Sequence, residues 1–232
     1  MNRHSFSVAF ASVATLICSS PVVASAQAFD GVITMRMNAS RPGGDGPQEI
    51  EYMAHGGKVR MNIKSQMGPV GIIGVPAEKK IYVLLDPQSM YMEMSTDAAA
   101  DRVAGATANM PDPKITRTGK KETIAGHECE HVTIEARQQT TDVCMARGLG
   151  PFMNAMSAMG AMMGGRGGAA QPAWQRSLAA DGGFPLKVTN HDGVVQLEVT
   201  KIEQKRLADA LFTVPGNYTK MDMSKMDMPR RP

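Results

Sequence analysis

The sequence predicts a mainly β (α+β) fold, built on an antiparallel sheet that is folded or curved on itself. The clearest sign is the strict alternation in residues 58–64, which places Val59, Met61 and Ile63 on one face of a strand. Residues 81–85 form a continuous apolar run, as expected for a strand that is buried on both faces. Many short segments of this kind are separated by turn signals, and that succession is typical of an antiparallel sheet.

Turn residues bound the expected strands. Gly56 and Gly57 predict a hairpin between residues 50–55 and 58–64. Residues 86–89 (Asp-Pro-Gln-Ser) end the apolar run, and residues 190–193 (Asn-His-Asp-Gly) turn the last pair of strands. Further strands are expected at 29–37, 90–94, 114–118, 121–124, 128–136, 140–146, 186–190 and 194–202.

Three segments break this pattern. Residues 38–48 are polar and rich in proline and glycine, which predicts a loop. Residues 96–110 are rich in alanine and predict a short helix. Within residues 149–183, a second helix is expected at 172–180, since Pro172 suits the first turn of a helix.

The first 28 residues predict export. A short basic start precedes an apolar run over residues 6–18, and small residues offer cleavage after Ala26 or Ala28. No later segment is apolar for long enough to span a bilayer. We therefore expect a signal peptide at 1–28 and a periplasmic or secreted location. Ile17 before Cys18 argues against a lipid anchor.

The rest of the chain predicts one β-rich domain and a short tail. The domain covers residues 29–219, and residues 220–232 form a Met/Asp/Lys tail that we expect to be mobile. The net charge of the whole chain is only +3. This charge is small and evenly spread, which argues against a nucleic-acid partner.

Two cysteines remain after export, Cys129 and Cys144. An even number in an oxidising compartment predicts a disulfide between them. Direct pairing would need a turn centred on residues 136–137, whereas Gln138-Gln139 looks the better turn, so a β-bulge is expected to reconcile the two.

Residues 127–131 match the zinc-protease pattern H-E-x-x-H. The following Val-Thr-Ile favours a strand, which would put Glu128 on the opposite face from both histidines. The protease chemistry is therefore not expected, and no other segment predicts an enzyme. A metal site remains an alternative to the disulfide, because His127, Cys129 and His131 would share one face near Cys144.

Methionine is abundant, with 20 residues in the chain. Its side chain is flexible and apolar, and its sulfur is also a soft ligand for Cu(I). One group recurs at near-helical spacing and suits a lid over the sheet: Met153, Met156, Met159, Met162 and Met163. A second group lies in the tail and suits Cu(I): Met221, Met223, Met226 and Met228.

Four segments carry a family resemblance: residues 29–35, 117–131, 183–188 and 211–221. Together they resemble an uncharacterised bacterial family named domain of unknown function 4412. The resemblance runs across most of residues 29–223, and its most specific part is a Gly-x-x-Cys-Glu element that ends at Glu130.

The family is assigned no activity, so the resemblance implies no catalytic residues. Its layout is similar to that of periplasmic lipoprotein carriers of the LolA and LppX type. Those proteins have a curved, incompletely closed antiparallel sheet, with a few helices covering the concave face and an apolar cavity for acyl chains. The resemblance implies the same architecture here.

We therefore expect an exported, non-enzymatic binding protein without a cofactor. Its partner would be a lipid, an acyl chain or a lipoprotein. The candidate lining residues follow from alternation alone: Met35, Met37, Val59, Met61, Ile63, Met92 and Met94. Three alternatives stay open: these residues fill an ordinary core, the chain binds Cu(I) or another metal, or it is a structural partner protein of the envelope. The sequence predicts no oligomeric state.

Overall fold

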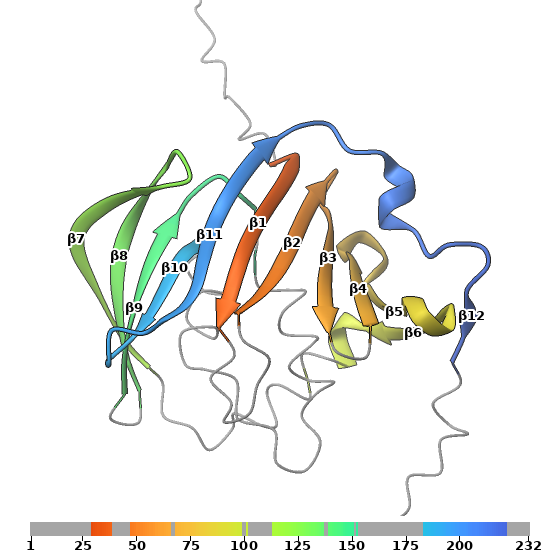
Figure 1. Cartoon of the computed structure of the whole chain (residues 1–232), viewed down its shortest axis with the longest axis horizontal. Helices are drawn as coiled ribbons and strands as arrows, with labels where there is room; N and C mark the ends of the chain where they lie inside the picture. Colours follow the sequence, from red (N-terminus) through yellow and green to blue (C-terminus); the bar gives the residue numbers. More distant parts are fainter. Residues whose placement is uncertain are drawn as a thin grey trace, which may run out of the picture.

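The computed structural model shows one open, curved sheet (Figure 1). It describes residues 29–38, 47–65, 68–98, 101, 113–136, 139–150, 152 and 183–221. Within them, twelve strands follow the order β12-β6-β5-β4-β3-β2-β1-β11-β10-β9-β8-β7. The expectation of a mainly β fold with an incompletely closed, curved antiparallel sheet is confirmed.

The strands are β1 (Gly31–Asn38), β2 (Pro47–His55), β3 (Lys58–Ser65), β4 (Gly68–Val75), β5 (Lys80–Leu85), β6 (Met90–Ser95), β7 (Lys114–Ile124), β8 (His127–Ala136), β9 (Gln139–Ala146), β10 (Phe184–Asn190), β11 (Val195–Gln204) and β12 (Thr219–Lys220). Three short 3-10 turns accompany them: η1 (Pro76–Glu78), η2 (Asp86–Gln88) and η3 (Asp209–Phe212).

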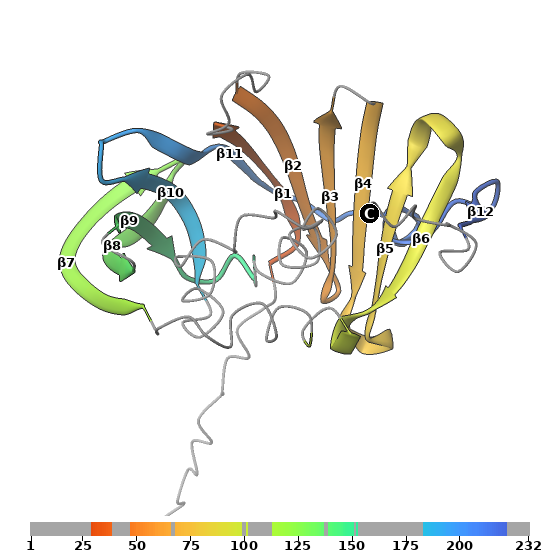
Figure 2. The same ribbon diagram turned by 90° about the horizontal axis from the view of Figure 1, so that it is seen from below.

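The sheet joins two runs of neighbouring strands. Strands β1 to β6 follow one another in order, as do β7 to β11, and β11 returns to pair with β1. These pairings are antiparallel, whereas the short β12 lies parallel to β6 at the edge. Seen from below, the strands at the β7 end turn away from the plane of β3 to β6, so the sheet is curved (Figure 2).

Two aromatic side chains identify the concave face. Tyr52 on β2 and Phe184 on β10 have ring centroids 5.3 Å apart. Strands β1 and β11 lie between β2 and β10, which in a flat sheet would hold β2 and β10 about 14 Å apart at about 4.8 Å per strand. The rings meet because the sheet bends toward the face that carries them.

One large apolar cluster includes the concave-face rings of Tyr52 and Phe184. It has buried members on β1 to β5 and on β7 to β11, and Met92 and Met94 of β6 pack against it. The strand register builds it in transverse rows, because directly paired residues point to the same side of a sheet. One such row runs Ile33, Tyr52, Met61, Ile72, Val83 and Met92.

A smaller cluster covers part of the convex face. There Met53, Ile73, Val75 and Leu84 pack around Phe212 of η3. We call residues 205–218 the C-terminal strap, since they lead from β11 to β12 across this side of the sheet (Figure 1). A backbone hydrogen bond from Lys205 to the Asp30 carbonyl fixes its start, and Thr219, the residue after its end, donates to the Ser89 carbonyl.

Several expected elements match the structure and others differ. The glycine hairpin and the turns at 86–89 and 190–193 are confirmed. Strand β4 was not expected. The two strands predicted at 114–118 and 121–124 form one strand, β7, whose pairing shifts between Arg117 and Lys121. The predicted β-bulge between the cysteine strands is wrong, because β8 and β9 pair without a register shift.

The expected covering helices fall largely outside the described residues. Of the first, residues 96–98 and 101 are helical, and the second, at 172–180, lies outside them altogether. The expected tail begins at Lys220, yet Lys220 belongs to β12 and the Met221 amide donates to the Tyr91 carbonyl. The chain thus stays on the sheet edge through residue 221. No helix in the described part of the chain has the length and apolar character to cross a membrane.

Candidate functional site

The concave face brings together all seven residues that alternation singled out. Four are buried in its cluster: Met35, Val59, Met61 and Ile63. The remaining three, Met37, Met92 and Met94, are partly buried and pack against the same cluster. The seven residues come from β1, β3 and β6, and they share one face because each strand contributes alternate residues to it.

The centre and the margin of this face differ in chemistry. Tyr52, Phe152 and Phe184 pack together, with centroids 5.0 to 6.2 Å apart. Burial raises the pKa of the Tyr52 phenol far above its ordinary value. The methionines Met37 and Met92 lie nearer the margin and keep some exposure. Because methionine is unbranched and polarizable, this part of the face can adapt to an apolar partner.

A separate hollow of about 280 Å³ lies at the β7–β9 end of the sheet. Its lining has positively and negatively charged side chains and few apolar ones. The lining residues are Arg117, Lys121, Glu128, Cys129, Glu130, Met145, Arg147 and Gly183. Two cross-strand ion pairs, Arg117 with Glu130 and Lys121 with Glu128, neutralise part of it. This hollow does not have the apolar lining expected of an acyl-chain site.

Cys129 and Cys144 form a disulfide, with Cα atoms 5.3 Å apart. They are not directly opposite, since the register of β8 and β9 pairs Cys144 with His131. The disulfide therefore runs diagonally, and this removes the need for the bulge that the sequence seemed to require. By alternation it lies on the opposite face from Val132 and Val143.

A polar cluster surrounds His131 beside this disulfide. The His131 side chain is only 6% exposed, and its two ring nitrogens meet two carboxylates. Nδ1 lies 2.6 Å from Asp142 Oδ1, and Nε2 lies 3.1 Å from Glu122 Oε2. Lys187 Nζ donates to the other oxygen of Glu122 at 3.3 Å. Four neighbouring strands, β7 to β10, thus each contribute one charged or titratable group.

The environment of Glu122 favours its charged form. Partial burial alone would raise the pKa of this carboxyl, but the hydrogen bond and charge of Lys187 and the contact with His131 outweigh burial. The net result is a pKa below the ordinary range. Glu122 is thus held as a carboxylate between a cation and an imidazole ring.

The metal set expected from residues 127–131 is not available in this arrangement. Cys129 is bonded to Cys144, and both nitrogens of His131 face carboxylates. His127 Nδ1 lies 3.3 Å from the carbonyl of Ala125, two residues before it. A different trio does converge, since one ligand atom each of Glu122, His131 and Cys144 lie within 4.8 Å of one another.

The sequence did not identify Glu122 as a site residue, because its position beside His131 depends on the register of strands β7 and β8. The turn at Ala125–Gly126 sets the β7–β8 pairing and puts Glu122 directly opposite Cys129. Both turn residues have positive φ, at 48° and 81°. An Ile-Ala-Gly-His string between two extended segments is the signal that could have located this turn.

The methionine groups give no second site among the described residues. The lid candidates Met153, Met156, Met159, Met162 and Met163 lie outside them, as do Met223, Met226 and Met228 of the tail. Met221 is described, and its amide is tied to β6. The copper alternative therefore gains no support from the geometry.

Fold and site together define a single-sheet β protein with one large apolar cluster and, at its β7–β10 end, a polar cluster beside a buried disulfide. The chain belongs to the family described as Domain of unknown function (DUF4412), which matches residues 29–218. No functionally curated protein matches the chain.

The similar solved structures match this chain only distantly. An uncharacterized conserved protein from Thermus thermophilus is 9% identical, with a TM-score of 0.49 over 84% of this chain and 91% of that one. PNGF-II is 13% identical, with a TM-score of 0.43 over 84% of this chain and 32% of that one. MucB, solved in complex with MucA(peri), is 13% identical, with a TM-score of 0.38 over 82% and 54%. The chain thus spans about a third of PNGF-II and about half of MucB.

Proposed function

We propose that the protein is an exported, non-enzymatic binding protein that holds an apolar ligand against the concave face of its sheet. The ligand class is an acyl chain, free or attached to a lipid or a lipid-modified protein. One observation carries this proposal: a single apolar cluster that reaches from β1 to β11 includes the rings of Tyr52 and Phe184, toward which the sheet bends.

The chemistry of the face supports an acyl chain over a polar ligand. Its residues offer methyl, methylene and thioether groups, and burying each methylene of a ligand there contributes about 0.8 kcal/mol. Met37, Met92 and Met94 are only partly buried, so they can gain contacts when a ligand arrives. Binding of this kind needs no reacting group, in keeping with a non-enzymatic role.

Strand β6 offers a matched test, because its residues alternate between the two faces. Replacing Met92 and Met94 by glutamine puts two amides on the concave face, where burial without a partner is unfavourable. Glu93→Gln changes the residue between them, which pairs with Lys80 and Lys220 on the other face. Titration with a dansyl-labelled fatty acid, followed by fluorescence, measures the affinity of each variant.

We expect wild-type protein and Glu93→Gln to bind the probe alike, and the double methionine variant to bind on the order of tenfold more weakly. Native mass spectrometry of the purified protein should also show co-purifying lipid. If wild-type protein binds no probe and carries no lipid, the apolar cluster is an ordinary filled core. If both variants bind equally well, the ligand lies elsewhere.

The proposed location rests on the first 28 residues. Expression of the full chain in a bacterial host, followed by intact-mass measurement of the exported form, tests it. We expect cleavage after Ala26 or Ala28. A full-length product that stays in the cytoplasm would contradict export without bearing on ligand binding.

A further inference from the structure

The polar cluster around His131 lies directly over the disulfide. Cys144 faces His131 across β8 and β9, and Cys129 faces Glu122 across β7 and β8. Each sulfur therefore has a nitrogen or oxygen ligand as its cross-strand neighbour. Ligand atoms of Glu122, His131 and Cys144 lie within 4.8 Å of one another.

These groups are the ones that zinc prefers. Zinc binds thiolate sulfur, imidazole nitrogen and carboxylate oxygen, and its four-coordinate sites are tetrahedral. Ligand atoms about 2.05 Å from the metal would then be about 3.3 Å apart. His131 Nε2 and Glu122 Oε2 are already 3.1 Å apart. What prevents binding is the disulfide, since disulfide-bonded sulfurs carry no thiolate charge to offer a metal.

The hydrogen-bond partner that would orient the His131 ring for metal binding is also present. Asp142 Oδ1 lies 2.6 Å from His131 Nδ1. A histidine that ligates a metal almost always donates its other ring N–H to such a carboxylate, which fixes the tautomer and the ring orientation. With Nδ1–H held by Asp142, Nε2 points toward Glu122 Oε2, and zinc entering between these two atoms would replace their hydrogen bond.

We propose that reduction of the Cys129–Cys144 disulfide creates a zinc site, with Cys144, His131 and Glu122 as ligands and Cys129 completing the tetrahedron. A dithiol reductant supplies two electrons and two protons, the S–S bond breaks to give two thiols, and the reductant becomes a disulfide. Zinc then displaces the two thiol protons and the proton of the His131 Nε2–Glu122 Oε2 hydrogen bond. All three protons leave to solvent, and the two thiolates, Nε2 and Oε2 bind the metal.

Lys187 balances the charge of this site. It pairs with Cys144 across β9 and β10, and its Nζ contacts Glu122 Oε1, the oxygen that does not face His131. Glu122 can therefore bind zinc through Oε2 and keep Lys187 on Oε1. An ammonium group beside a thiol also favours the thiolate, which is the metal-binding form.

The test compares oxidised and reduced protein in the absence of oxygen and of free reductant. Co²⁺ replaces zinc as a visible probe, and competition with a chromophoric indicator then measures Zn²⁺ affinity. We expect the reduced protein to bind one ion per chain, with a thiolate-to-cobalt charge-transfer band and intense tetrahedral d–d bands. The oxidised protein should show neither. Asp142→Asn should weaken zinc binding by about 10 to 100 fold.

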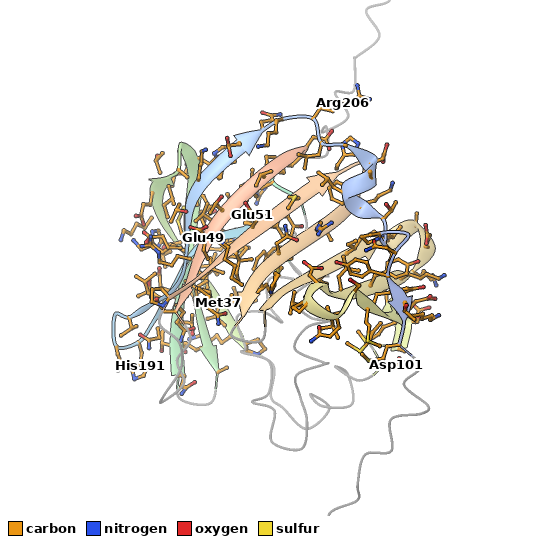
Figure 3. The ribbon with its side chains drawn as sticks, turned by 45° about the vertical axis from the view of Figure 1, so that its right-hand side comes forward. Met37, Glu49, Glu51, Asp101, His191 and Arg206 are labelled. Carbon is orange, nitrogen blue, oxygen red and sulfur yellow. A yellow bond between two sulfur atoms is a disulfide. The ribbon has the colours of Figure 1, made fainter. Side chains whose placement is uncertain are left out.

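The ligand variants His131→Ala and Glu122→Gln should weaken binding more than the control His191→Ala. His191 lies at the tip of the β10–β11 turn (Figure 3), beside Asp192, and would report adventitious binding by an exposed histidine. Equal zinc binding by oxidised and reduced protein would overturn the proposal, as would a cobalt spectrum without thiolate bands.

If the reduced chain unfolds, zinc should restore the folded circular-dichroism spectrum of the reduced wild-type protein but not that of His131→Ala. The reason is that metal binding stabilises the folded state. Failure of zinc to restore it would equally overturn the proposal. The zinc test involves no apolar ligand, so it stands apart from the acyl-chain experiment.

Discussion

Phe212 of the C-terminal strap lies against the ring of His55 on β2, with centroids 6.0 Å apart. This contact anchors the strap, which contains no strand, to the convex face of the sheet. Polar contacts surround this anchor: Lys58 Nζ donates to Asp209 Oδ1 at 3.0 Å, and Arg60 Nη1 donates to the Leu211 carbonyl at 2.9 Å. Phe212 itself is 1% exposed, so its burial dominates the attachment.

Phe212→Ala should therefore lower the free energy of unfolding by about 3 to 5 kcal/mol. The adjacent Leu211 gives the control, because its side chain is 37% exposed and only its carbonyl is used by Arg60. Leu211→Ala should change stability by less than about 0.5 kcal/mol. Urea unfolding of the three proteins measures both effects. Equal stability of Phe212→Ala and wild type would mean that the strap is not anchored by this residue.

The disulfide should contribute measurably to stability. It links residues 15 apart in the sequence, and the chain-entropy account assigns a loop of this size about 3 kcal/mol. Replacing both Cys129 and Cys144 by alanine should lower the free energy of unfolding by about that amount. Wild-type protein in reductant and chelator is the control and should behave like the double variant. A double variant as stable as oxidised wild type would contradict the prediction.

Periodicity explains how much of the fold could be predicted. A strand places alternate residues on one face, so Val59, Met61 and Ile63 could be assigned to one side before any pairing was known. The number of strands was harder to predict, because β12 has only two residues, and its place is set by its pairing with the edge strand β6. Lys220 therefore carries no strand signal of its own.

Register explains why the polar cluster could not be predicted. Its members come from four strands, and they meet only because β7, β8, β9 and β10 pair at one particular offset. A shift of one residue in any pairing would turn Glu122 or Lys187 to the other face. The sequence identified His131 by its motif, but no local pattern pointed to its partners.

Strand β4 escaped prediction because glycines interrupt its apolar pattern. A Cβ at Gly74 would lie 2.9 Å from Val59 Cγ2, so the glycine makes room for a side chain of the neighbouring strand. Gly74→Ala should therefore destabilise the protein by about 1 to 3 kcal/mol through overpacking.

A double-mutant cycle with Val59 isolates this contact. Val59→Ala removes the methyl group that Gly74→Ala would strike, so the double variant should lose less stability than the sum of the two single variants. Thermal unfolding of the four proteins gives the coupling. Strict additivity would show that the cost of Gly74→Ala arises elsewhere.

Because Tyr52 is buried, the stability of the folded protein depends on pH in the alkaline range. Its pKa is raised above the ordinary value of 10.0, so the folded state holds the phenol proton to higher pH than the unfolded chain does. Above about pH 10 the unfolded state binds fewer protons, and stability falls as pH rises, by at most about 1.4 kcal/mol per pH unit for one group. Below that pH both states keep the proton, and the contribution is complete.

Tyr52→Phe removes this group while keeping the ring that packs on Phe184. Urea unfolding of both proteins at about pH 9 and about pH 11 should show a smaller loss of stability in the variant, because only the wild type must ionise this phenol on unfolding. The comparison between the two pH values cancels any effect of the substitution that does not depend on ionisation. An identical pH dependence in the two proteins would mean that the Tyr52 phenol is not held protonated by the concave face.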